Sequence, residues 1–132
     1  MNITTISAHP DIIVFDAGAK FLVNLKDEID DKSRIIKRYC ILSGELKCVV
    51  IAECNAKIHE KSFNSAIVCD CGHLLGISDM TYDLSGKYDT GAYLSVYETS
   101  AGKIGIIIGD DIMLPDTEKR LKDMGAQQII IL

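Results

Sequence analysis

Hydrophobic and polar residues follow one another along the chain in blocks that predict β-strands at both ends and in the middle. An apolar run at residues 11–15 lies between Pro10 and a small, polar segment, which indicates a buried strand. Residues 46–52 and 63–71 are rich in β-branched side chains and flank a polar stretch at residues 55–61, which is typical of a hairpin. Further strands are predicted at residues 93–99, 103–108 and 128–132.

Apolar residues recur at helical spacing between residues 19 and 42, which predicts either one long helix or two. Gly44 suits the position just after a helix end. A further helix is expected to open at Pro115, because proline is favoured in the first helical turn, and to run to about Met124. Helices between strands at both ends, with a meander between them, predict a layered α/β domain with a mixed sheet.

Length and composition are those of one globular domain spanning residues 1–132, with 48% hydrophobic and 25% charged residues. The net charge of −5 disfavours a nucleic-acid partner, which would need a basic face. No apolar stretch is long enough for a membrane helix, and no signal peptide is visible at Met1, so a cytoplasmic protein is expected.

The cysteines are odd in number and lack the spacing of a small secreted domain, which indicates reduced thiols. They are Cys40, Cys48, Cys54, Cys69 and Cys71. We interpret them as small core side chains. The alternative is a metal site at Cys69 and Cys71, which would share one strand face, with His59 or His73.

One segment has a distinctive pattern. Gly102 and Gly105 begin an apolar strand that ends at Gly109, and an acidic pair and Pro115 follow. The segment resembles the nucleophile region of the nitrilase, or carbon–nitrogen hydrolase, superfamily. Upstream, in the same order, the Asn-Ser-Ala stretch from Asn64 and the Gly-x-x-x-Gly spacing that ends at Gly76 resemble further family motifs.

The resemblance implies half of a nitrilase-like αββα sandwich, with a mixed sheet and helices on one face. The chain is about half as long as a typical family member, which predicts that the first strand and helix and the C-terminal half of the fold are absent. One sheet face would then stay exposed in a monomer, and a second copy could supply the other sheet. A homodimer is therefore expected.

The resemblance also locates three catalytic positions, those of a Glu base, a Lys and a Cys nucleophile. In this sequence they are Ala17, Met80 and Gly109. None of the three side chains can move a proton, stabilise an oxyanion or form a thioester. The catalytic positions are therefore predicted to be vestigial.

Asp16, Asp79 and Asp110 each adjoin one of the vestigial positions, and Asp111 matches an Asp of the family motif that the segment resembles. If they converge, their oxygens could bind a hard cation, or the turn at Gly109 could bind a small anion. Otherwise they are caps and solvated loop acids, which are common at strand ends. No cofactor is expected.

Three functions remain open. The first is a non-catalytic binding or assembly module on a degenerate nitrilase-like scaffold, with a small-molecule ligand still conceivable. The second is a carbon–nitrogen hydrolase with relocated groups, and the third is a metal- or anion-binding domain. The groups available for relocation are Cys54, Cys69, Cys71, Glu45, Glu53, Lys87 and Lys103.

Overall fold

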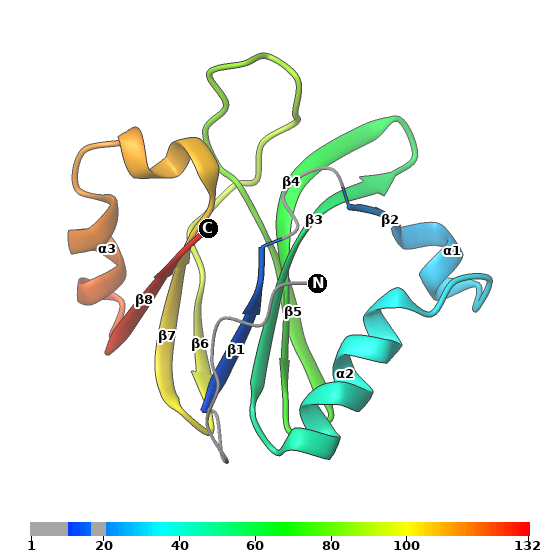
Figure 1. The fold of residues 1–132 in the computed structure, drawn as a ribbon. Coiled ribbons are helices and arrows are strands. Elements are labelled where there is room, and N and C mark those ends of the chain that lie inside the picture. Colours follow the sequence, from blue (N-terminus) through cyan, green and yellow to red (C-terminus); the bar gives the residue numbers. More distant parts are fainter. Residues whose placement is uncertain (1–10, 17–20) are drawn as a thin grey trace.

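Two β-sheets pack against each other in the computed structural model, which describes residues 11–16 and 21–132 (Figure 1). Sheet A has the strand order β1-β3-β4-β5, and β2 pairs with the far end of β3. Its strands are β1 (Ile12–Phe15), β2 (Leu22–Asn24), β3 (Val49–Ile58), β4 (Lys61–Asp70) and β5 (His73–Asp79). Sheet B contains β6 (Val96–Thr99), β7 (Gly102–Ile107) and β8 (Gln128–Ile131) in that order.

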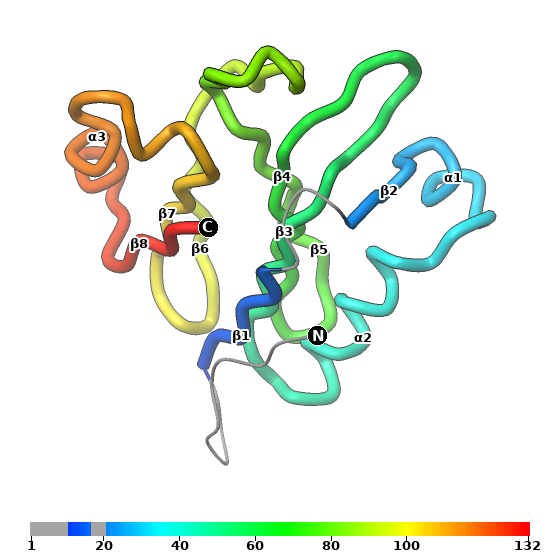
Figure 2. The backbone as a smooth tube through the Cα atoms, turned by 45° about the horizontal axis from the view of Figure 1, so that its top comes forward, coloured from blue at the N-terminus to red at the C-terminus, as the bar shows by residue number. Residues whose placement is uncertain are grey.

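Helices cover the outer face of each sheet. Helices α1 (Leu25–Ile29) and α2 (Ile35–Leu46) lie on sheet A, and α3 (Thr117–Asp123) lies on sheet B. The tube view in Figure 2 keeps the same order of layers, with α3 and α2 at opposite sides of the molecule. Both sheets are mixed, since β1 and β8 run parallel to their neighbours while β4 and β6 run antiparallel. The predicted α/β class with mixed strand pairing is confirmed, although the chain forms two such sheets rather than one.

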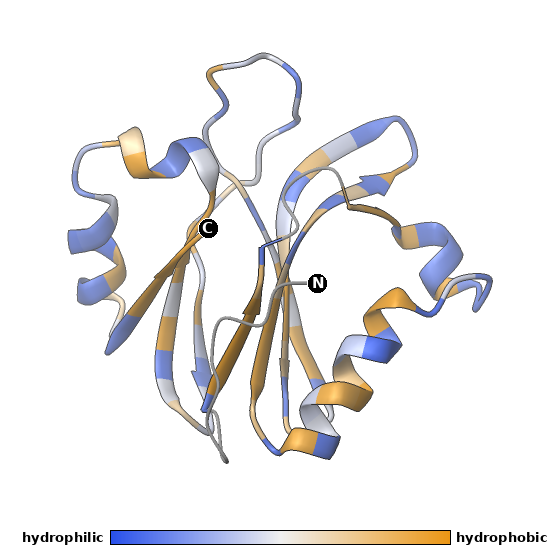
Figure 3. Cartoon of the chain, viewed as in Figure 1, coloured by the Kyte–Doolittle hydropathy of each residue, from blue (hydrophilic) through white to orange (hydrophobic). Residues whose placement is uncertain are grey.

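Strand alternation builds two cores from the same strands. Val49 and Ile51 of β3 face sheet B, where they belong to one cluster with Ile104 and Ile106 of β7. The residue between them, Val50, faces the opposite way and packs in the core beneath α2. Both faces of these central strands are therefore buried, which explains their nearly continuous apolar sequence (Figure 3).

The second sheet comes from this chain. The sequence suggested that a second copy could cover the open face of a single sheet, but β6, β7 and β8 already cover the inner face of sheet A. Local patterns could not show this, because the pairing of the two sheets depends on contacts between segments far apart in the sequence. Dimerisation stays a prediction, without the argument from an uncovered sheet.

Several predicted boundaries are wrong for identifiable reasons. The expected turn at residues 55–61 is mostly strand, because β3 pairs with β2 on one side and β4 on the other, and the chain reverses only at His59 and Glu60. Residues 22–24 form β2 and not the start of a helix, and the turn at residues 30–34 divides the rest of the helical region into α1 and α2.

Gly44 lies inside α2, not after it. A Cβ there would be 3.2 Å from the Cα of Gly72, so glycine permits close packing of the helix on the β4–β5 turn. The helix ends at Leu46, with Lys47 in the left-handed conformation. Likewise, α3 begins at Thr117 rather than at Pro115.

No helix in residues 11–16 and 21–132 is long and apolar enough to cross a membrane.

Candidate functional site

The segment that carries the family resemblance ends strand β7 at a tight turn. Gly109 follows Ile108 with a φ of +53° and opens a short 3-10 helix, Gly109–Met113. An L-residue is strained in this left-handed conformation, so the turn favours glycine. Its neighbour Ile108 is buried between the two sheets, so the turn lies at the end of the inter-sheet core.

The space in front of Gly109 is filled by a side chain from sheet A. A Cβ on Gly109 would be 2.8 Å from the Sδ atom of Met80 and 3.1 Å from the Nδ2 atom of Asn64. Met80 is only 2% exposed, and its backbone is fixed by hydrogen bonds to Asn64 and Gly91. Two predicted vestigial positions, Met80 and Gly109, therefore lie in contact, and a side chain at residue 109 would require the Met80 sulfur to move.

Backbone N–H groups at the turn, which could otherwise bind an anion, already have acceptors. The N–H of Asp110 donates to the Met80 sulfur at 3.4 Å. The N–H of Gly109 donates to the carbonyl of Leu132 at 3.2 Å, and that of Asp111 donates to Ile108. A methionine sulfur is a weak acceptor, so the contact with the Asp110 N–H group is a weak hydrogen bond.

Asp111 is a buried structural carboxylate. It is 1% exposed, and both of its oxygens lie 3.0 Å from the Thr81 amide nitrogen, which donates to them. The Thr81 hydroxyl donates a further hydrogen bond of 2.9 Å. Nothing local in the sequence pointed to Thr81, because the two residues are 30 positions apart and meet only in the folded chain.

Thr81 belongs to the loop of residues 80–91, which follows β5, and Asp110 holds the same loop from a more exposed position. Its Oδ2 atom accepts a hydrogen bond of 2.8 Å from the N–H of Leu84. Within the loop, Asp83 accepts hydrogen bonds from the backbone N–H of Tyr88 and from Ser85, which lower the pKa of the Asp83 carboxyl below its usual value. The carboxylates here thus organise the loop that follows Met80.

The remaining candidate acids do not join this group. Asp79 accepts a hydrogen bond of 2.6 Å from the Ser65 hydroxyl, and Asp16 is exposed at the end of β1. Ala17 lies outside the described residues. Across the described part of the chain, no three His, Cys, Asp or Glu side chains are grouped so that they could hold a metal ion.

The buried thiols are poorly suited to a relocated nucleophile. Burial, reinforced by the carboxylates of Asp79 and Glu53, raises the pKa of Cys54 to about 12. Glu53 and Cys54 are adjacent on β3, so their side chains point to opposite faces of sheet A. Burial also raises the pKa of Cys69, and a thiol that keeps its proton is a weak nucleophile.

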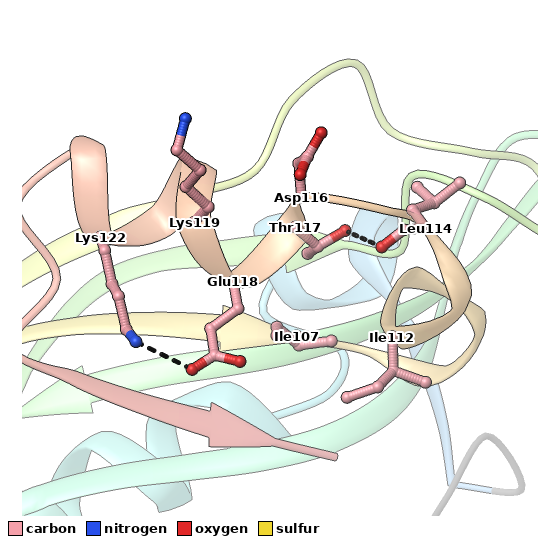
Figure 4. A pocket seen from close by; sticks show the side chains of 8 residues that line it. All are labelled: Ile107, Ile112, Leu114, Asp116, Thr117, Glu118, Lys119 and Lys122. Atoms are coloured by element: carbon pink, nitrogen blue, oxygen red, sulfur yellow. Dashed lines mark hydrogen bonds and ion pairs between the residues drawn. The ribbon is translucent and has the colours of Figure 1, made fainter.

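An open pocket of about 560 Å³ lies on the other face of β7, under α3 (Figure 4). Ile107 forms its floor, and three of the charged side chains on its wall, Glu118, Lys119 and Lys122, form ion pairs within α3. Lys122 lies 3.0 Å from the Glu118 carboxylate, while Lys119 points away from both, and Thr117 donates a hydrogen bond to Leu114. The pocket therefore offers space but no converging set of reactive groups.

Known structures resemble this fold closely, although no family model and no curated protein matches the sequence. A carbon–nitrogen hydrolase from Helicobacter pylori G27 superposes with a TM-score of 0.67 at 19% identity, over 80% of this chain and 38% of that one. Saccharomyces cerevisiae Nit3, of the nitrilase superfamily, gives 0.62 at 19% identity over 73% and 38%. An N-terminal amidase gives 0.68 at 19% identity over 94% and 39%.

These likenesses establish a nitrilase-like fold, as the sequence motifs predicted. At such low identity they establish the fold alone. The chain spans less than two fifths of the length of each of the three proteins.

Proposed function

We propose that this chain is a non-catalytic binding or assembly module built on a nitrilase-like scaffold. The observation that carries the proposal is the contact between Met80 and Gly109. The position that the resemblance assigns to the nucleophile has no side chain, and a buried methionine fills the space in front of it. The Met80 sulfur lies where a side chain at residue 109 would extend, and it also accepts the hydrogen bond of the Asp110 N–H group.

Two further observations favour this proposal over the hydrolase alternative. A relocated mechanism needs a reactive thiol near a base, but the pKa of Cys54 and that of Cys69 are both raised by burial, and the exposed Cys71 has the Ser100 hydroxyl as its partner at 3.8 Å. The amine candidate Lys103 lies on β7 in sheet B and pairs with Glu98 at 3.6 Å, whereas Cys54 and Cys69 lie on strands of sheet A. The anion-binding alternative is disfavoured because the N–H groups around Gly109 have internal acceptors.

Release of ammonia from primary amides, nitriles and N-carbamoyl compounds tests the proposal. We expect no release above a heat-denatured control, at protein concentrations high enough to detect very slow turnover. A variant with all five cysteines replaced by Ala or Ser serves as the matched control for contamination. Turnover that survives repeated purification and disappears in the cysteine-free variant would contradict the proposal.

Assembly is the form of this function that the surface favours. Large apolar side chains are exposed at both ends of the molecule, among them Ile29 on α1, at 78%, and Met113 beside the Gly109 turn, at 66%. Association of two copies would remove such side chains from water, although single exposed apolar residues also occur on monomeric proteins. Sedimentation at micromolar concentration is expected to give a mass near that of a dimer, and a mass near 14.5 kDa would contradict a self-assembly role.

A further inference from the structure

Two cysteines from distant parts of the sequence meet beneath helix α2. The sulfur atoms of Cys40, on α2, and Cys69, on β4, are 2.9 Å apart. Cys69 is fully buried in the core under the helix, and Cys40 packs against that core from above. The two residues belong to elements that already touch, so joining them requires only a small movement of the side chains.

Cys40 can be reached from outside the core. It is only partly buried, and it lines an apolar groove of about 410 Å³ between the helices and sheet A. The groove is also lined by Leu25, Ile36, Leu74 and Ile77. A small reagent that enters this groove meets the Cys40 sulfur first and finds Cys69 directly behind it.

We propose that Cys40 and Cys69 form a reversible, redox-sensitive cross-link that ties α2 to sheet A. This inference is independent of the proposed function. The oxidant is a low-molecular-weight disulfide. The Cys40 thiolate attacks one of its sulfurs, which forms a mixed disulfide and releases one thiol. The Cys69 sulfur then attacks Cys40 Sγ, the S–S bond to the small molecule breaks, and the second thiol leaves with the Cys69 proton. The chain loses two hydrogen atoms, and the oxidant gains them.

Cys69 is the second, resolving thiol, because it is fully buried and lies next to the Cys40 sulfur, whereas Cys40 is the cysteine that lines the groove. The cross-link would enclose the end of α2 and the whole β3–β4 hairpin. It would stabilise the fold by limiting the freedom of the unfolded chain. It would also fix one wall of the apolar groove, because Cys40 belongs to that wall.

Treatment of the full chain with oxidised glutathione, followed by intact-mass and peptide analysis without reduction, tests the proposal. The expected product is lighter by two hydrogen atoms and yields one peptide pair joined through Cys40 and Cys69. The melting temperature of the oxidised chain is expected to rise by roughly 10 °C, and the rise should disappear on reduction.

Matched variants separate this pair from the other thiols. Cys71 is exposed, so Cys71→Ser removes the thiol most prone to join two chains and should leave the cross-link and the temperature shift unchanged. Cys40→Ser, at a partly buried position, should abolish both, and Cys40→Ala provides the same test if the serine variant does not fold. Full alkylation of both cysteines after oxidation, or the same shift in a Cys40 variant, would overturn the proposal.

Discussion

The two faces of strand β7 end in different surroundings. On the inner face, the turn at Gly109 meets Met80 and Asn64, and the space in front of it is closed. On the outer face, Ile107 forms the floor of a pocket of about 560 Å³, where Lys122 pairs with Glu118 and no reactive groups converge. The open pocket thus lies where no reactive groups converge. The turn at Gly109, where the resemblance places the nucleophile, is filled by Met80. Substitutions on the closed inner face should therefore lower the free energy of unfolding far more than substitutions on the open outer face.

Replacement of the buried carboxylate should have the largest effect. Asp111→Ala leaves the amide and hydroxyl donors of Thr81 without acceptors, so we expect the free energy of unfolding to fall by about 4 kcal/mol. Asp110→Ala is the matched control. It removes one hydrogen bond at a more exposed position and should cost about 1 kcal/mol. Urea denaturation measures the free energy of unfolding of both variants. A loss for Asp111→Ala as small as that for Asp110→Ala would mean that Asp111 does not hold the loop.

The contact in front of Gly109 can be measured by a double-mutant cycle. Met80→Ala should lower the free energy of unfolding by about 3 kcal/mol, because it leaves a cavity in a closed site. Gly109→Ala should cost about 2 kcal/mol in the wild-type chain, from backbone strain and from collision with the Met80 sulfur.

In the Met80→Ala background the backbone strain and the contact with the Asn64 Nδ2 atom remain, but the collision with the Met80 sulfur is gone, so the Gly109 substitution should cost about 1 kcal/mol less. If the losses in free energy of unfolding for Met80→Ala and Gly109→Ala simply add in the double variant, Met80 does not fill the space at Gly109.

These residues also mark what the sequence could and could not reveal. The apolar blocks at residues 46–52, 63–71 and 103–108 predicted buried strands because burial on both faces leaves a continuous apolar signature. That signature does not say which sheet a strand joins, so the assignment of β6, β7 and β8 to a second sheet of the same chain was missed.

The candidate site was predictable in a similar, partial way. The order of motifs located Met80 and Gly109 as inert positions, because a side chain's chemistry can be read without a structure. Met80 fills the space beside Gly109 because the end of β5 lies next to the end of β7 in the fold. No local sequence pattern indicates this contact. The sequence identified Asp110 and Asp111 as candidates. It did not reveal their structural role, because their hydrogen-bond partners lie in a loop about 30 positions away.

A reactive thiol elsewhere in the chain could replace the missing nucleophile. The pH dependence of stability tests whether the Cys54 thiol ionises in the folded chain. The pKa of Cys54 is raised to about 12 from 9.0, so above pH 9 the unfolded chain loses this proton while the folded chain keeps it. The free energy of unfolding should therefore fall as pH rises, by up to about 1.4 kcal/mol per pH unit between about pH 9 and pH 12. Below pH 9 this thiol should contribute no slope.

Denaturant unfolding of wild type and Cys54→Ala across this range isolates the contribution, because the variant should show the shallower decline. The same slope in both chains would indicate that Cys54 ionises as readily in the folded chain as in the unfolded one. Such a thiol would again be a candidate nucleophile.

The smallest effect is expected in the outer pocket. Glu118→Ala breaks an exposed ion pair with Lys122, one helical turn away, and should change the free energy of unfolding by less than about 0.5 kcal/mol. Thermal denaturation at low and high salt checks this. A loss comparable to that of Met80→Ala would reveal a structural role for the pocket and would remove the contrast between the two faces of β7.

The central claim, that no cysteine of this chain acts as a hydrolytic nucleophile, is tested most directly by looking for the covalent intermediate. The protein is mixed with a primary amide or an activated ester, quenched in acid within one turnover, and weighed intact by mass spectrometry. Our account predicts a chain of unchanged mass at every time point. A chain heavier by one acyl group, with the group mapped to a single cysteine and lost again on further incubation, would contradict it.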